Sequence, residues 1–193
     1  CTSGFRETFG GLHLMHNVYP DMAMFGKALG NGYAITAIIG IESVMQAAQS
    51  TFISSTFWTE RIGPAAALKT LEIMEQTKSW ETVTKTGKTI KKGWQEMADK
   101  YNLQITHNGI AALAGFSFKS ENAIKYKTYI TQEMLKKGYL AATSCYVSLS
   151  HDDNTIREYF EALQDIFAEI SQCEQGKPID ELLEGPVCHN GFK

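Results

Sequence analysis

Residues 22–32 read M-A-M-F-G-K-A-L-G-N-G, a short apolar run followed by one lysine and a glycine-rich loop. The apolar run Met22–Phe25 predicts a β-strand, and a second, almost entirely apolar run follows at Ile35–Ile41. Strands that are apolar on both faces belong in a sheet that is covered on both sides. The stretch therefore predicts an α/β fold with this sheet in its core.

Lys27 lies where the first predicted strand ends and the glycine-rich loop begins. A lysine moved from water into such a site favours its neutral amine, because desolvation penalises the ammonium form. A neutral amine is the nucleophile that forms a Schiff base with an aldehyde, and glycines let the backbone approach a flat cofactor closely. The alternative is that Lys27 simply extends its charged end into solvent.

Two further stretches carry polar groups that could serve a ligand. Residues 2–6 read T-S-G-F-R, which is compatible with a turn or with a loop beneath a ligand, where Arg6 holds either structure or an anion. Residues 54–60 read S-S-T-F-W-T-E and precede an alanine-rich segment. Hydroxyls and backbone N–H groups at a helix N-terminus form a natural phosphate site, although such a run can also be a simple helix cap.

The rest of the chain alternates predicted helices and strands. The last helix is the clearest, because its apolar residues recur at a spacing of about 3.6 and Asp152 is well placed for its N-terminus. The strand–helix–strand–helix order of the second half suggests a small α/β domain that starts near residues 78–102. The expected elements are helices at 59–74, 80–101, 121–137 (ended by Gly138) and from Asp152 to Gly176, and strands at 103–105, 112–118 and 139–150.

Composition excludes several classes of protein. The chain has 193 residues, of which 44% are hydrophobic, and a formal net charge of -3. It is too apolar to be disordered as a whole, and it has no strong positive field for nucleic acid. It shows neither a membrane-spanning stretch nor a signal peptide, and its four cysteines lack zinc-ligand spacing. We therefore expect a cytoplasmic protein with no metal site and no nucleic-acid or membrane partner.

Four stretches together carry a family resemblance. They read T-S-G-F-R, P-D-M-A-M-F-G-K-A-L-G-N-G, S-S-T-F-W-T-E and Y-V-S-L-S-H-D-D. In this order and spacing the chain resembles the class III, pyridoxal-phosphate-dependent aminotransferases, and within them the glutamate-1-semialdehyde aminomutase group. The resemblance runs from Cys1 to about Ile170, which is nearly the whole chain.

The resemblance implies roles for individual residues. Lys27 matches the lysine that forms a Schiff base with pyridoxal phosphate and then moves a proton during amino-group transfer. Thr56 matches the threonine that reaches the cofactor phosphate of the neighbouring subunit, with Ser55 as a second cofactor-binding residue and Glu60 as a possible helper. The resemblance thus implies a homodimer with a shared active site that acts on a small-molecule amino donor or acceptor.

The resemblance also implies an architecture, the C-terminal part of a fold-type I pyridoxal-phosphate-dependent transferase. Residues 1–77 would end the large cofactor-binding domain, 78–175 would form the small C-terminal α/β domain, and 176–193 would be a surface tail. The family's aspartate for the pyridine nitrogen would fall two residues before Cys1, and its N-terminal half has no counterpart. We therefore expect the isolated chain to bind cofactor poorly and to catalyse little.

Several features differ from the family pattern, and other functions stay open. Ala34 stands where members often have proline, and Trp58 begins W-T-E-R in place of S-G-N-P. No arginine is assigned to a substrate carboxylate, so the substrate is open. The alternatives are a non-catalytic dimerisation or interaction fragment of the same fold, and an unrelated α/β enzyme in which Lys27 pairs with a carboxylate or phosphate.

Overall fold

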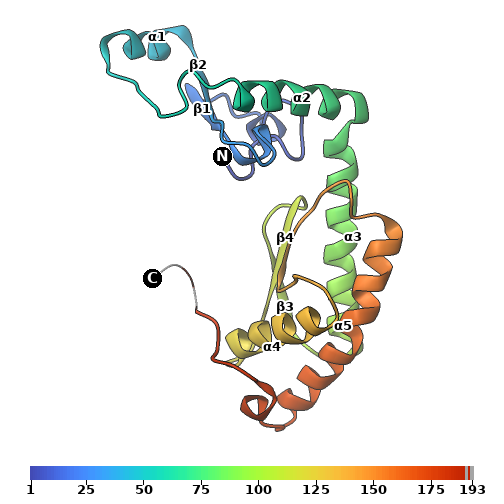
Figure 1. Ribbon diagram of the computed structural model, residues 1–193. Helices are drawn as coiled ribbons and strands as arrows, with labels where there is room; N and C mark the ends of the chain where they lie inside the picture. Colours follow the sequence, from blue (N-terminus) through green and yellow to red (C-terminus); the bar gives the residue numbers. More distant parts are fainter. Residues whose placement is uncertain (190, 192–193) are drawn as a thin grey trace. The chain divides into compact units, whose positions relative to one another are not determined.

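The computed structural model describes residues 1–189 and 191 and divides the chain into two compact units (Figure 1). Unit 1 comprises Cys1–Thr84, and unit 2 begins at Lys85. The division falls within a continuous helix, α3 (Ser79–Lys100).

Unit 1 is built around a pair of short strands. β1 (Met22–Phe25) and β2 (Ala37–Gly40) pair antiparallel, with Met22 opposite Gly40 and Phe25 opposite Ala37. Both strands coincide with apolar runs from which they were predicted. The other elements are η1 (Leu12–His16), η2 (Lys27–Leu29), α1 (Glu42–Met45), η3 (Gln46–Ser50), α2 (Ile62–Thr77) and the start of α3.

One face of the β1–β2 pair carries the core of unit 1. The rings of Phe5 and Phe25 lie 5.7 Å apart between centroids. Leu29 of η2 and two residues of α2, Ala67 and Met74, complete this buried cluster. Because Phe25 is the last residue of β1, the core holds the backbone in place directly before Lys27.

The opposite face of the pair is open, which corrects the expectation of a sheet covered on both sides. Met24 is 57% exposed and Ile38 is 52% exposed. On this face Met22 and Ile38 line a cavity together with Met45, Ile53 and Phe57, so the face is only partly covered. β1 and β2 therefore carry more apolar surface than the described residues of unit 1 bury.

Unit 2 contains a three-stranded antiparallel sheet in the order β3–β4–β5. Its core joins the sheet to two helices, since Trp94 of α3 lies 4.8 Å and Phe167 of α5 lies 6.0 Å from the Phe116 ring of β4. Besides the remainder of α3, the elements are β3 (Ile105–Asn108), β4 (Leu113–Phe118), α4 (Ala123–Lys136), β5 (Ser144–Tyr146), α5 (Asp153–Glu174) and η4 (Ile179–Leu182).

The helix ends in unit 2 follow the predicted signals. Asp152 caps α5, because its Oδ1 accepts a hydrogen bond from the backbone N–H of Thr155 at 2.7 Å. Gly138 follows α4 with φ +87°, a conformation that glycine adopts without strain. The capping residue and the glycine therefore bound these helices as the sequence indicated.

Two strand predictions are wrong in their extent. The run at 103–105 is not a strand, because the Leu103 N–H instead bonds to the Ala98 carbonyl at the end of α3. β3 begins only at Ile105, which pairs with Phe118. The predicted strand at 139–150 is reduced to β5, and Leu140 in the preceding loop is 97% exposed.

The segment after α5, which the sequence suggested to be a surface tail, packs against α4. Ile179 is buried, and the Gln132 side chain is hydrogen-bonded to this segment twice. Its Nε2 donates to the Leu182 carbonyl at 2.9 Å, and its Oε1 accepts from the Glu184 N–H at 2.8 Å. Residues 190, 192 and 193 of the expected tail lie outside the described residues.

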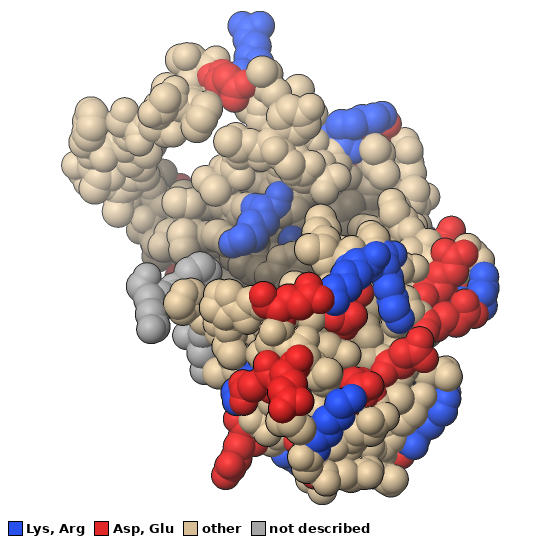
Figure 2. Space-filling model, turned by 60° about the horizontal axis from the view of Figure 1, so that its bottom comes forward, with Lys and Arg blue, Asp and Glu red and all other residues tan. Residues whose placement is uncertain are grey.

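Surface charges of both signs are interspersed on the face shown in Figure 2. On α5, Arg157 pairs with Glu161 at 2.7 Å, and on α4 Lys136 pairs with Glu133 at 2.6 Å. Exposed pairs of this kind contribute little to stability. None of the helices in residues 1–189 combines the length and the apolar composition that crossing a membrane requires.

His107 on β3 makes the stability of unit 2 depend on pH. Burial, and then the charge of Lys91, lower the pKa of His107 below its ordinary value of 6.5. The unfolded chain therefore takes up a proton at a higher pH than the folded chain. We expect the free energy of unfolding to fall as pH decreases below about 6.5 and to level off below the folded-state pKa.

Urea unfolding at pH 7.5 and at lower pH values tests this expectation, with His107→Gln as the variant. The variant keeps a group that can donate to Gln95, whose Oε1 lies 3.1 Å from His107 Nε2. It should lose part of the pH dependence while keeping its stability at pH 7.5. An unchanged slope in the variant would assign the pH dependence to other groups.

Candidate functional site

Lys27 is presented at the end of a strand by the core beneath it. Phe25 is buried, Gly26 follows, and Lys27 begins η2 with φ +44°. Its Nζ donates a hydrogen bond to the Thr2 hydroxyl at 2.9 Å, and its side chain is exposed. Among the described residues no acidic side chain forms an ion pair with Lys27. The amine therefore has a neutral partner, and unit 1 does not provide the desolvation expected for it.

The glycine-rich loop after Lys27 has one position that only glycine can occupy. A Cβ on Gly30 would collide with the carbonyl oxygen of Tyr33. The Tyr33 N–H in turn donates to the Gly30 carbonyl at 3.1 Å. The loop is thus a tight turn directly after the lysine.

The loop at residues 2–6 lies beside Lys27, although 25 residues separate Thr2 from the lysine. Arg6 Nε donates to the Thr2 carbonyl at 2.8 Å, and the Leu12 N–H donates to the Gly4 carbonyl at 2.8 Å. Two roles were considered for Arg6, holding the loop together and binding an anion. The structure shows the first. The sequence did not single out Thr2, and its position in T-S-G-F-R was the available signal.

The segment 54–60 does not cap the helix that follows it. α2 begins at Ile62, and the residue before it, Arg61, makes no capping hydrogen bond through its side chain. Ser55 Oγ accepts from the Phe57 N–H at 3.3 Å in a local turn. Thr56 is exposed, and no hydrogen bond within the described residues joins it or Ser55 to Lys27. The Thr56 hydroxyl is therefore exposed, whereas Ser55 Oγ already accepts a backbone hydrogen bond.

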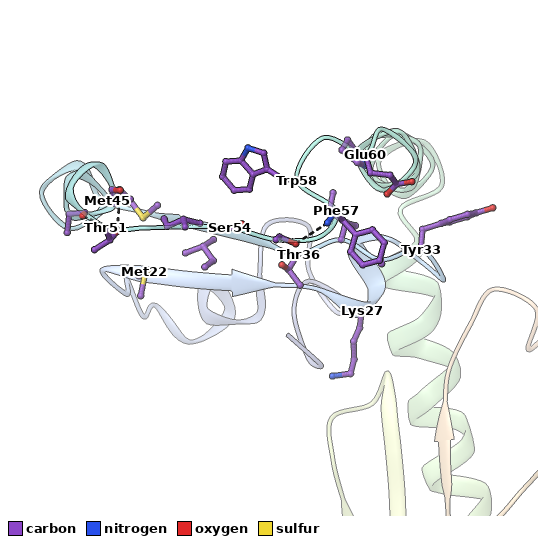
Figure 3. A pocket seen from close by; sticks show the side chains of 18 of the residues that line it. Met22, Lys27, Tyr33, Thr36, Met45, Thr51, Ser54, Phe57, Trp58 and Glu60 are labelled. Carbon is purple, nitrogen blue, oxygen red and sulfur yellow. Dashed lines mark hydrogen bonds between the residues drawn. The ribbon is translucent and has the colours of Figure 1, made fainter.

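A large cavity opens beside β2 in unit 1 (Figure 3). Its volume is about 1070 Å³, and the residues that line it include Ser55, Phe57 and Trp58 from the loop before α2 and Thr36 and Ile38 from the β2 region. Lys27 borders the cavity, but Figure 3 shows its side chain directed away from Phe57 and Trp58. Thr56 is not among the lining residues described.

Metal chemistry has no evident support in the described part of the chain. Within residues 1–189 and 191, no three His, Cys, Asp or Glu side chains gather in a way that could hold a metal ion. The four cysteines are free thiols, and burial raises the pKa of Cys145 and Cys173. Neither thiol is thereby activated as a nucleophile.

Comparison with known proteins identifies relatives along most of the chain. The family described as "Aminotransferase class-III" matches residues 3–167. The 3-aminobutyryl-CoA aminotransferase of Cloacimonas acidaminovorans is 31% identical over 176 residues, which are 88% of this chain and 42% of that protein. The glutamate-1-semialdehyde 2,1-aminomutase of Methanocaldococcus jannaschii is 28% identical over 182 residues, 86% of this chain and 42% of that protein.

Solved structures show the same fold. The FumI protein of Sphingopyxis sp. MTA144, in its PLP internal aldimine form, superposes with a TM-score of 0.78 at 24% identity, covering 93% of this chain and 44% of that one. A transaminase with PLP bound gives a TM-score of 0.77 at 15% identity, over 90% of this chain and 44% of the other.

These matches confirm the fold expected from the sequence, the C-terminal part of a fold-type I transferase. The chain spans less than half the length of the curated relatives and solved structures it matches. The family match nevertheless covers most of its residues, including Lys27 and the loop before α2. The chain belongs to the class-III aminotransferase family.

Proposed function

We propose that this chain supplies the amine-bearing part of a pyridoxal-phosphate-dependent enzyme that transfers an amino group. The transfer runs between two small molecules, as in an aminotransferase, or within one, as in an aminomutase. The printed names of the relatives include both kinds of enzyme. The proposal rests on one observation. The Lys27 amine lies just after the end of β1 and donates a hydrogen bond to the uncharged hydroxyl of Thr2.

The residues of unit 1 fit the aldehyde end of pyridoxal phosphate. Lys27 offers a primary amine whose described hydrogen-bond partner, Thr2, is uncharged, so binding an aldehyde breaks no ion pair. The loop that follows turns tightly at Gly30, where a Cβ would collide with the Tyr33 carbonyl oxygen. When bound, the cofactor supplies a ring that stabilises negative charge at the reacting substrate carbon.

Lys27 has two tasks in this proposal. Its Nζ would hold the cofactor covalently by condensing with the aldehyde carbon, with water as the leaving group. Once the substrate amine has displaced Nζ from the cofactor, the free Nζ would take a proton from the substrate carbon. It would then return this proton to a different carbon atom. Thr2 positions the amine between these tasks through its hydroxyl, which accepts the hydrogen bond of 2.9 Å.

Ser55 and Thr56 are proposed to bind the cofactor phosphate of a neighbouring subunit. The Thr56 side chain is exposed and outside the helix-capping position, so its hydroxyl is available to an external anion. The segment around it exposes apolar rings, with Phe52 94% and Trp58 67% exposed. Exposed apolar patches mark interaction surfaces. The active site is therefore proposed to be shared within a homodimer.

The two parts of the chain receive different roles. Residues 1–77 are proposed to complete the large cofactor-binding domain of the enzyme. Residues 78–175 are proposed to form its small C-terminal domain. This assignment places Lys27, Ser55 and Thr56 together on the cofactor-binding part.

A borohydride trap tests the proposed function. The chain is incubated with pyridoxal phosphate, reduced, digested and searched by mass spectrometry for a phosphopyridoxyl lysine. A stoichiometric adduct on Lys27 is the expected result when the preceding part of the enzyme is present. Labelling scattered over surface lysines in the isolated chain would show that unit 1 alone does not complete the site. The same scatter with the preceding part present would contradict the proposal.

A further inference from the structure

The dipeptide Asn-Gly occurs three times in the chain, at residues 31–32, 108–109 and 190–191. In such a pair the residue after the asparagine has no Cβ, so its backbone nitrogen can approach the asparagine side chain closely. Attack of this nitrogen on the side-chain carbon expels ammonia, so the pair can modify itself. Asn190 lies outside the described residues, and the first two pairs can be compared in the structure.

Asn31 and Gly32 are the two central residues of the turn that follows Lys27. The Tyr33 N–H closes this turn by donating to the Gly30 carbonyl at 3.1 Å. Both central residues have a positive φ, +46° and +110°, which is the backbone that Asn-Gly favours. The conformation of the turn therefore accounts for the dipeptide, and it also places a reactive pair in the loop.

The two reacting groups of this pair are free of contacts with the rest of unit 1. Asn31 and Gly32 are both exposed, and a Cβ added to Gly32 would meet no atom within 4 Å. In the part of the chain that the structure describes, no hydrogen bond engages the Asn31 side chain or the Gly32 N–H. The Gly32 nitrogen can therefore lose its proton to solvent and reach the side chain before it.

The second pair is also exposed, but strand pairing holds it in place. Asn108 is the last residue of β3 and lies opposite Gly115 of β4. Its side chain packs against this glycine, since a Cβ on Gly115 would collide with Asn108 Oδ1. The carbonyl of Gly109 accepts a hydrogen bond from Lys91 Nζ at 2.5 Å. Asn108 can therefore react only after the end of the strand has opened locally.

We propose that Asn31 is a site of spontaneous deamidation. The deprotonated Gly32 nitrogen forms a bond to Asn31 Cγ, and the side-chain nitrogen leaves as ammonia, which closes a five-membered imide. Water then cleaves either of the two C–N bonds between the imide nitrogen and the former asparagine. One cleavage leaves aspartate in the normal backbone, and the other leaves isoaspartate. The net reaction consumes one water and releases one ammonia, so it needs no other reactant.

Both products change the loop next to Lys27. The side chain gains a negative charge, and isoaspartate adds one methylene to the backbone between Gly30 and Tyr33. The structure leaves no room for this extension, because Gly30 and the Tyr33 carbonyl are already too close for a Cβ. The turn must therefore open when isoaspartate forms. The Asn31 N–H, which donates to the Lys27 carbonyl at 3.1 Å, is part of the same turn.

The modification is independent of the proposed function, and the two can fail separately. Deamidation depends on Asn31 and Gly32, whereas the borohydride trap depends on the Lys27 amine. A chain that deamidates at Asn31 but forms no adduct in the completed enzyme would support this inference and contradict the proposed function. A chain that forms the adduct while Asn31 stays intact would do the reverse.

Peptide mapping by mass spectrometry measures the reaction in the 193-residue chain during incubation at neutral and at mildly alkaline pH. Each deamidation raises the mass of a peptide by about one dalton. We expect Asn31 to react at least about tenfold faster than Asn108, because only Asn108 must wait for local opening. Both rates should rise with pH, since the attacking nitrogen must lose its proton. In urea the two rates should converge, because the unfolded chain has lost the pairing of β3.

Asn31→Gln is the matched variant, because it keeps a side-chain amide but lengthens the chain that must close the ring. It should lose the reaction at residues 31–32 and leave the rate at Asn108 unchanged, with circular dichroism as the check on folding. Equal rates at Asn31 and Asn108 in the folded chain would overturn the inference. So would an Asn31 that stays intact in the folded chain over a time in which the urea-unfolded chain deamidates there.

Discussion

Lys27→Ala is expected to abolish the borohydride-stable adduct on unit 1. The variant removes the primary amine, which is the atom that forms the covalent bond, so the loss should be complete rather than partial. In the proposed enzyme, in which the chain is joined by the part that only its longer relatives carry, turnover should fall by at least about 10²–10⁴-fold, the contribution typical of a lost general base. Mass spectrometry of the reduced protein and a steady-state assay of amino-group transfer measure the two effects.

Lys27→Arg is the control that separates charge from nucleophilicity. A guanidinium can still donate to the Thr2 hydroxyl and keeps the positive charge, but it stays protonated and cannot attack an aldehyde. We expect the arginine variant to behave like the alanine variant. Lys85→Ala, on the solvent-exposed surface of α3, should retain the full adduct. Retention of the adduct in Lys27→Ala would assign the covalent bond to another lysine.

Trp94→Ala is expected to be the most destabilising single change in unit 2. Trp94 is completely buried, its ring lies 4.8 Å from that of Phe116, and its Nε1 donates to the Tyr159 hydroxyl at 2.9 Å. Truncating a buried tryptophan to alanine typically costs about 3–5 kcal/mol. Because a domain is stable by only about 5–15 kcal/mol, this cost removes a large part of the stability of the unit.

Urea unfolding followed by circular dichroism measures the loss, with Trp58→Ala as the matched control. The control makes the same chemical change at a side chain that is 67% exposed, so its effect should stay within about 0.5 kcal/mol. Tyr159→Phe isolates the hydrogen bond, and it should cost about 1–3 kcal/mol because it leaves the buried indole N–H without an acceptor. Similar stabilities for the two tryptophan variants would contradict the packing described for unit 2.

The sequence indicated the elements that carry an apolar or capping signal of their own, and it misplaced a polar strand that depends on pairing. Helix α5 was recognisable from its apolar stripe and from Asp152, because both signals lie within or beside the helix itself. β3 was misplaced because Thr106 and His107 are polar and gain their strand conformation only by pairing with Ser117 and Phe116. A strand of this kind has no periodic signal of its own.

The candidate site likewise has one feature that the sequence could predict and others that depend on how the chain folds or assembles. Lys27 could be recognised from the strand and loop around it, whereas its contact with Thr2 depends on how the chain folds back over 25 residues. The relation of Thr56 to the cofactor stays a prediction, because it concerns a neighbouring subunit. The exposed face of β1 and β2 shows that an apolar pattern predicts a strand without showing which of its faces the described residues cover.

The backbone of Lys27 has a consequence for how this site can evolve. Its φ of +44° lies in the left-handed region, which costs an ordinary side chain about 1–2 kcal/mol and costs glycine almost nothing. Replacing Lys27 with glycine would therefore remove the conformational cost of the backbone and the amine in a single substitution. Selection for thermal stability alone would favour the loss of this lysine. Under the proposed function, keeping the lysine trades this conformational ease for a reactive amine.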